Sequence, residues 1–284
     1  MIRFGPAGNS DSFTAKGYKN ALQIPDYLKE FGLNAFEYQA GRGVKISEDA
    51  AKRFGEAAKA GGIELSIHAP YYISLASAEQ EKRLNSINYF LQAAKAITAM
   101  GFGRVVFHPG GVGKMSRADA LAATKDTLKK AIEALDAAGY GSVRLCPETM
   151  GKINQIGDLA EVIEICTMDE RLIPCIDFGH LNARTLGGLK AFGAVQNVFE
   201  SIESSLGVSR LREMHAHFSK IEFTAGGEKQ HLTFDDAIYG PDFEPVAEML
   251  AKKQVNNAVF ICESAGTQAE DAQKMKRIFE AVRV

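Results

Sequence analysis

Short apolar runs rich in β-branched and aromatic residues alternate along the chain with longer amphipathic segments. The short runs are predicted to be strands, because their length and composition are typical of buried β-structure. They occupy residues 2–5, 34–39, 63–68, 104–108, 142–148, 172–177, 211–217 and 258–263. The longer segments have helical periodicity and start signals such as Ser47, and they occupy residues 24–31, 47–60, 78–100, 116–138, 156–167, 194–206, 245–253 and 269–282.

Eight strand–helix units fit into 284 residues, which leaves about 35 residues for each unit. This repeat predicts an α/β fold, a closed (β/α)8 TIM barrel that forms a single domain over residues 1–284. An open doubly wound sheet is the alternative, but its dinucleotide-binding forms carry a GxGxxG turn after the first strand, whereas residues 5–8 are GPAG. The longest connection, residues 219–242, is polar and contains glycines, and we interpret it as a loop or lid over a site.

Composition narrows the classes of function. Apolar residues make up 46% and charged residues 24% of the chain, which excludes a disordered protein. Lys and Arg number 33 against 35 Asp and Glu, so the net charge of −2 excludes nucleic-acid binding by bulk positive charge and leaves only a local basic patch. Because the chain shows neither a membrane-length apolar run nor the core of a signal peptide, we expect a cytoplasmic protein without a membrane partner. The four cysteines form no CxxC pair, and we expect them to be reduced and buried.

Histidines and carboxylates gather at the ends of the predicted strands. The chain has six histidines, and four of them end a strand or lie beside its end. These strand-end residues are His68, His108, His215 and His217, together with the carboxylates Glu148, Asp177 and Glu263. A fifth histidine, His180, follows Asp177 by three residues. Because all strands of such a barrel end on one face, these side chains are expected to converge there.

So many buried imidazoles and carboxylates would repel one another or lose hydration unless a cation paired with them. Mixed histidine and carboxylate ligands suit Zn²⁺, with Mn²⁺ as the alternative. Strand alternation places Cys146 on the face of Glu148 and Cys175 on the face of Asp177, so a small thiol is expected beneath each carboxylate. The sequence therefore predicts a metal centre at the mouth of the barrel.

Several motifs resemble those of a known family. They are HAPY at 68–71, FHPGG at 107–111, PETMG at 147–151, CIDFGH at 175–180, MH at 214–215 followed by SK at 219–220, and ES at 263–264. In this order, over residues 63–263, they resemble endonuclease IV, the zinc-dependent apurinic/apyrimidinic endonucleases within the xylose-isomerase-like barrel superfamily. The FHPG and CID-x-x-H segments are specific when they occur together, whereas ES alone is not.

The resemblance implies two or three Zn²⁺ ions, or Mn²⁺, in sites that share ligands. The first would be held by His68, His108 and Glu148, and the second by the bridging Glu148 with Asp177, His215 and Glu263. The third would be held by His180 and His231, which an Asp of a D-x-H motif completes in the family. Here Lys229 occupies the position of that Asp, so Glu228 or His217 is the candidate replacement ligand.

The implied activity is hydrolysis of a phosphodiester 5′ to an abasic site in DNA, which leaves a 3′-hydroxyl and a 5′-deoxyribose phosphate. Glu148 and Glu263 would be the catalytic carboxylates, the first bridging the metals and the second orienting the nucleophile. Tyr71 matches a DNA-contacting tyrosine of the family, and Arg42 lies in the loop that enters the DNA minor groove there. The implied partner is therefore DNA with abasic sites, and no obligate protein partner is implied.

Two other functions remain open at this stage. A sugar isomerase or epimerase of the same superfamily would need one divalent metal held by Glu148, Asp177, His215 and Glu263, and Glu37 at the second strand would suit it as an acid. In that case His68, His108 and His180 would be surplus. A barrel that binds or stores metal without catalysis is the third interpretation.

Overall fold

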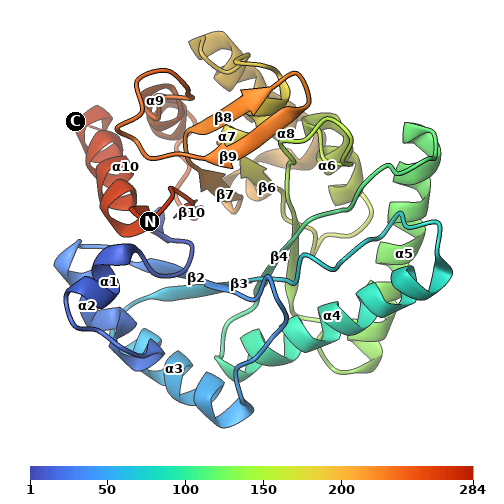
Figure 1. Ribbon diagram of the computed structural model, residues 1–284, viewed down its shortest axis with the longest axis horizontal. Helices are drawn as coiled ribbons and strands as arrows, with labels where there is room; N and C mark the ends of the chain where they lie inside the picture. The colour runs from blue at the N-terminus through green and yellow to red at the C-terminus, as the bar shows by residue number, and fades with distance from the viewer. Residues whose placement is uncertain (284) are drawn as a thin grey trace.

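A barrel of parallel strands, surrounded by helices, forms the centre of the computed structural model, which describes residues 1–283 (Figure 1). Its strands are β1 (Arg3–Pro6), β2 (Ala35–Gln39), β3 (Glu64–His68), β4 (Arg104–Phe107), β5 (Arg144–Pro147), β6 (Cys175–Asp177), β7 (His215–Phe218) and β10 (Val259–Cys262). They pair in parallel in the orders β1-β10-β7-β6 and β2-β3-β4-β5. The bridges Ala7–Glu37 and Glu148–Cys175 join the two halves, and the predicted (β/α)8 barrel is thereby confirmed.

Side chains cap several of the helices that surround the barrel, and Ser47 does so as predicted. Ser47 and Asp158 each accept a backbone N–H of the first turn, from Ala50 and Glu161. The helices are α1 (Asp11–Ala15), η1 (Ala21–Gln23), α2 (Ile24–Glu30), α3 (Glu48–Ala60), α4 (Gln80–Ala99), α5 (Arg117–Ala137), α6 (Leu159–Cys166), α7 (Phe178–Arg184), α8 (Phe192–Arg212), α9 (Glu244–Lys252) and α10 (Gln268–Val282). No helix among residues 1–283 combines the length and apolarity that a membrane crossing needs.

Several segments differ from the prediction, and they include the short helix α1, where no element was expected. The short helix α7 follows β6 directly, since the Asp177 side chain caps it by accepting the N–H of His180 at 2.7 Å. The segment predicted as a loop contains an antiparallel hairpin, β8 (Ile221–Thr224) and β9 (Gly227–His231). Helix α8 continues through a kink at Gly207 to Arg212, so β7 starts at His215 and not at residue 211.

The two faces of the barrel strands carry different residues. Outward side chains such as Phe107, Phe218 and Phe260 pack under the helices in the main apolar core. The inward side chains form two small apolar clusters, Ala7 with Ala35, Val259 and Ile261, and Val106 with Cys146, Ile173 and Cys175. All four cysteines are buried and free, as predicted. The remaining inward positions are polar, and they lead up to the site.

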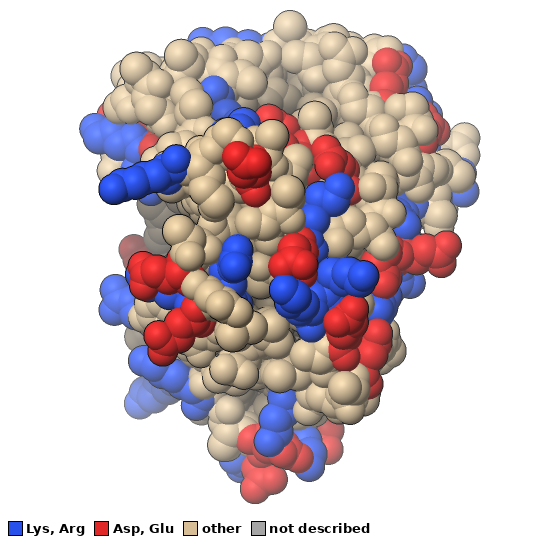
Figure 2. Space-filling model, turned by 90° about the vertical axis from the view of Figure 1, so that its right-hand side faces the viewer, with Lys and Arg blue, Asp and Glu red and all other residues tan. Residues whose placement is uncertain are grey.

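The exposed surface carries both signs of charge. Figure 2 shows acidic and basic side chains interspersed over one side of the molecule. This distribution agrees with the net charge of −2, and any recognition of an anionic ligand must therefore come from local groups.

Candidate metal centre

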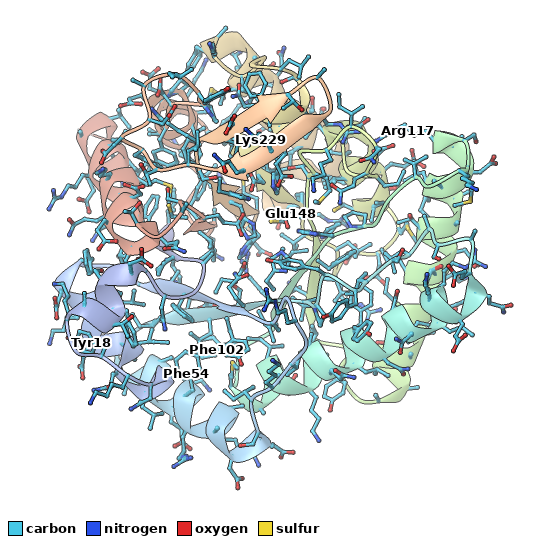
Figure 3. The ribbon with its side chains drawn as sticks, viewed as in Figure 1. Tyr18, Phe54, Phe102, Arg117, Glu148 and Lys229 are labelled. Carbon is cyan, nitrogen blue, oxygen red and sulfur yellow. The ribbon has the colours of Figure 1, made fainter. Side chains whose placement is uncertain are left out.

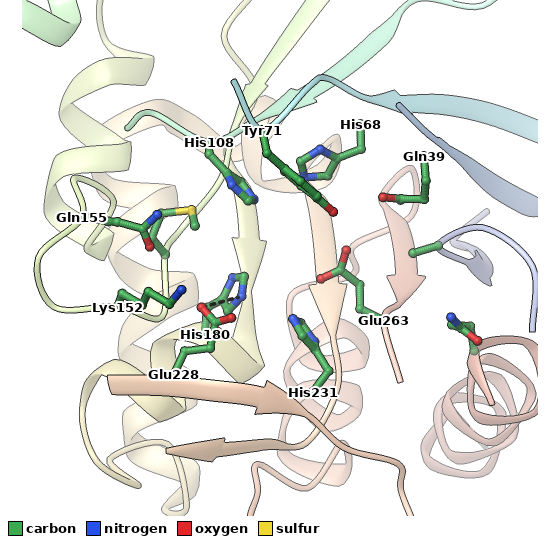
Figure 4. A pocket seen from close by; sticks show the side chains of 13 residues that line it. Gln39, His68, Tyr71, His108, Lys152, Gln155, His180, Glu228, His231 and Glu263 are labelled. Carbon is green, nitrogen blue, oxygen red and sulfur yellow. Dashed lines mark ion pairs between the residues drawn. The ribbon is translucent and has the colours of Figure 1, made fainter. Parts of the chain in front are cut away.

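A pocket of about 630 Å³ opens at the carboxyl ends of the strands (Figure 4). Three of its lining residues, His68, His108 and His180, contact the buried Glu148, which lies near the centre of the barrel (Figure 3). His68 and His108 line one side of this pocket, and His180, Glu228 and His231 line the other (Figure 4). The strand-end residues are therefore gathered at one mouth, as the barrel geometry predicts.

The first group of donors consists of His68, His108 and Glu148. Nε2 of each histidine lies 3.1 Å from Oε2 of Glu148. Nδ1 of His68 lies 2.9 Å from the Ala69 carbonyl, which accepts the Nδ1–H and so leaves Nε2 free for a metal. The Tyr71 ring stacks on His108 at 5.2 Å with an interplanar angle of 17° and fixes that imidazole from the solvent side.

The second group consists of Glu148, Asp177, His217 and Glu263. Nδ1 of His217 lies 3.3 Å from Oε1 of Glu148 and 3.4 Å from Oε1 of Glu263. Oδ2 of Asp177 is buried, has no hydrogen bond among the described residues, and lies 3.3 Å from Nδ1 of His180. Three carboxylates so close together form a donor set that a divalent cation would neutralise.

The third group consists of His180, Glu228 and His231. Nε2 of His180 lies 3.4 Å from Oε2 of Glu228, and the Ser219 hydroxyl fixes Nδ1 of His231 at 2.8 Å. Lys229 is turned away from this group and pairs with Glu222 on the hairpin at 2.7 Å. The structure thus places Glu228, and not Lys229 or His217, beside the two histidines.

His215 lies elsewhere than the resemblance implies. In the parallel register His217 is opposite Asp177, whereas His215 is opposite Cys175, one inward position deeper in the barrel. Nε2 of His215 lies 3.0 Å from Oε2 of Glu37, and burial lowers the pKa of His215 to about 4, so this imidazole is neutral. His217 lies with Glu148, Asp177 and Glu263, whereas His215 lies with Cys175 and His217 in a fourth, fully buried group of donors.

The charges in the mouth are strongly coupled. Burial alone would raise the pKa of Glu148, but the neighbouring imidazoles of His217 and His108 hold it well below its usual range. Burial likewise would lower the pKa of His180, yet Asp177 and Glu148 raise it well above its usual range. For Glu263, burial and the charge of Glu148 raise the pKa despite His217 nearby. The raised pKa values of His180 and His217 favour protons on these two imidazoles, which balance the carboxylates in the metal-free protein, and bound cations would take over this role.

The two proposed DNA-contacting residues lie at the rim. Tyr71 is 56% exposed and lines the pocket, whereas Arg42 is exposed on the loop after β2 and lies outside the pocket lining. Gly41 lies under the Tyr71 ring, where a Cβ would come within 2.5 Å of it.

Three glutamines line the pocket that the sequence did not predict as site residues: Gln39, Gln155 and Gln268. Of these, Gln39 could have been found from its position at the end of a strand, β2.

Comparisons with known proteins agree with this architecture. A protein of Methanocaldococcus jannaschii of uncharacterised function is 33% identical over 276 residues, covering 97% of this chain and 96% of its own length. A probable endonuclease 4 of Methanosphaera stadtmanae is 30% identical over 197 residues, 69% of each chain.

Two solved structures share the fold with a TM-score of 0.68. They are endonuclease IV from Thermus thermophilus, at 19% identity over 99% of this chain and 98% of that one, and D-psicose 3-epimerase from Clostridium cellulolyticum, at 13% identity over 99% of both. The family model described as xylose isomerase-like TIM barrel matches residues 25–282. The chain therefore belongs to the xylose isomerase-like TIM barrel family.

Proposed function

We propose that this protein is a metal-dependent phosphodiesterase that cleaves DNA 5′ to abasic sites. The observation that carries the proposal is the division of the Glu148 carboxylate between two donor groups. Its Oε2 lies 3.1 Å from His68 and His108, and its Oε1 lies 3.1 Å from His180 and 3.3 Å from His217. A carboxylate engaged on both oxygens in this way is suited to bridge two metal ions, which a single-metal isomerase does not need.

When bound, two Zn²⁺ ions would supply Lewis acidity toward a phosphate and lower the pKa of a water molecule. The residues would divide the remaining tasks. Glu263 is 15% exposed and faces the pocket with a raised pKa, so it is placed to orient a water and accept its proton. Lys152 lines the same pocket and offers a positive charge to a phosphate oxygen.

Residues at the rim of the pocket would recognise DNA. Tyr71 presents an exposed aromatic face beside the metal groups, and Arg42 adds a positive charge on the adjoining loop. An abasic nucleotide stacks poorly and is easily turned out of a duplex into a pocket. The similarity to a probable endonuclease 4 supports this substrate class.

The test uses a duplex oligonucleotide with one tetrahydrofuran abasic analogue, which cannot undergo β-elimination. We expect incision 5′ to the analogue that is abolished by a chelator, restored by Zn²⁺ or Mn²⁺ and lost in His108→Ala. Lys130→Ala is the matched control, since Lys130 is exposed on α5 and pairs only with Asp126 there. Absence of incision by protein shown to contain metal would refute the proposal.

A second candidate function is epimerisation or isomerisation of a sugar at a single metal. It is favoured by the second donor group alone, because Glu148, Asp177, His217 and Glu263 provide a complete set of four ligands. Glu37 does not supply the extra acid expected from the sequence, since it is fully buried beneath this group and does not line the pocket. One metal ion per chain, together with conversion of a 2-ketohexose detected by chromatography, would favour this function over DNA cleavage.

A further inference from the structure

Glu37 lies directly beneath the second donor group and is completely buried. Four donors surround its carboxylate, two at each oxygen. Nε2 of His217 lies 3.1 Å and Nε2 of Gln39 lies 3.2 Å from Oε1. Nε2 of His215 lies 3.0 Å and the Ser66 hydroxyl lies 2.9 Å from Oε2. Gln39, Ser66 and His215 are hydrogen-bonded to this carboxylate, and the His217 imidazole is in ion-pair contact with it.

A buried carboxylate is costly to retain, and apolar residues of similar size would fill the same space at less cost. The position of Glu37 relative to His217 gives a reason for this buried carboxylate. One nitrogen of that imidazole faces Glu37, and the other, Nδ1, faces Glu148 and Glu263. Glu37 and the proposed metal site therefore lie on opposite sides of one ring.

We propose that Glu37 is a positioning residue of the metal centre and acts through His217. It accepts the Nε2–H of His217, so that Nδ1 carries the lone pair directed at the cation held with Glu148, Asp177 and Glu263. A carboxylate behind a ligating imidazole fixes its tautomer and orientation and increases its basicity. The inference rests on the metal centre of the proposed function and holds for either reaction considered there.

His68 provides an internal comparison. Nδ1 of His68, the nitrogen that does not face Glu148, is paired with the neutral backbone carbonyl of Ala69. The corresponding nitrogen of His217 is Nε2, and it faces the Glu37 carboxylate. The second donor group is thus expected to contain the more basic imidazole and to bind the cation more tightly. Ser66 and His215 contact the opposite oxygen of Glu37, Oε2, and leave Oε1 to His217 and Gln39.

The test compares Glu37→Gln with Ser66→Ala, a control that removes one contact of Glu37 without touching His217. Zn²⁺ affinity is measured by competition with a chromophoric chelator, and the ligand field is followed in the Co²⁺ form. Glu37→Gln should weaken the tighter Zn²⁺ about 10- to 100-fold and shift the Co²⁺ absorption bands, whereas Ser66→Ala should change affinity less than about threefold. Circular dichroism verifies that both variants are folded.

A folded Glu37→Gln variant with wild-type affinity and an unchanged Co²⁺ spectrum would overturn the inference. If that variant does not fold, Glu37→Asp keeps the charge but withdraws it from His217, and undiminished Zn²⁺ affinity would overturn the inference equally. Nitrogen-15 spectra of the Zn²⁺ form give an independent result, since His217 must be the Nε2–H tautomer. Zn²⁺ binding that depends on Glu37 without cleavage of abasic DNA would refute the proposed function alone.

Discussion

Replacing Glu263 by glutamine should have opposite effects on the metal-free and the metal-bound protein. Burial and the neighbouring charge of Glu148 raise the pKa of Glu263, so ionisation of this carboxyl at neutral pH destabilises the metal-free fold. Glutamine has nearly the same volume and carries no charge. The metal-free variant should therefore melt at a temperature equal to or above that of the metal-free wild type.

The gain in melting temperature on binding Zn²⁺ should be smaller in Glu263→Gln than in the wild type. Zn²⁺ at 1,000 times its Kd stabilises a protein by about 4 kcal/mol. The unfolding entropy of a chain of 284 residues is about 0.6 kcal/mol per degree, so the wild type should gain about 7 °C. If loss of one ligand weakens binding about 100-fold, the same metal concentration stabilises the variant by only about 1.4 kcal/mol, or about 2 °C.

The assay is thermal unfolding followed by far-ultraviolet circular dichroism, because the chain has no tryptophan to report by fluorescence. Each protein is measured after treatment with a chelator and again with Zn²⁺. Glu280→Gln is the matched control, since Glu280 is an exposed carboxylate of α10 far from the pocket lining. The reasoning fails if Glu263→Gln lowers the melting temperature of the metal-free protein or keeps the full gain with Zn²⁺.

Further predictions concern stoichiometry, substrate binding and pH. Glu148→Gln should deplete metal from both groups that share it, whereas His108→Ala should deplete one, as measured by elemental analysis of dialysed protein; equal losses would contradict the bridging role. Lys152→Ala should raise KM for abasic DNA severalfold at unchanged metal content. It should also make KM depend less steeply on salt concentration, because one contact with a phosphate is lost. Glu161→Gln should cost about 2 kcal/mol at neutral pH, because Arg117 and two backbone N–H groups hold the pKa of this buried carboxyl below its usual value despite the opposing effect of burial. The stability difference between the wild type and this variant is fully present above the unfolded-state pKa of Glu161. It should vanish as the pH falls through the lower folded-state pKa, so urea midpoints of both proteins at neutral and at acidic pH check its sign.

The alternation of strands and helices was predictable because each element has its own periodicity in the sequence. The convergence of His68, His108, Glu148 and Glu263 followed from the topology, since strand ends of a parallel barrel meet on one face. Helix α7 was missed because it has only seven residues and begins without a break after Asp177. The β8–β9 hairpin was missed because its strands are short and mostly polar, which makes them resemble a loop.

The assignment of His215 shows the limit of strand alternation. His215 and His217 share a face, so the pattern directs both inward without indicating which of them reaches the mouth. The depth depends on the register with β6, and that register is set by pairing between strands that lie far apart in the sequence. Similarly, the choice of Glu228 over Lys229 depends on which face of the hairpin turns toward His180, and the twist of a two-stranded hairpin is not visible in its sequence.

The polar interior of the barrel gives these observations a common cause. Each strand contributes inward side chains in layers, and a TIM barrel ordinarily fills such layers with branched aliphatic residues. Here Glu37, Ser66 and His215 occupy the layer beneath the metal donors, and only small apolar clusters share the interior with them. The apolar burial that stabilises this fold must therefore come from the layer between strands and helices, where residues such as Phe107, Phe218 and Phe260 pack. Because the interior contributes less to stability, its side chains are free to be selected for holding the ligands of the layer above, and substitutions there should affect metal binding more than folding.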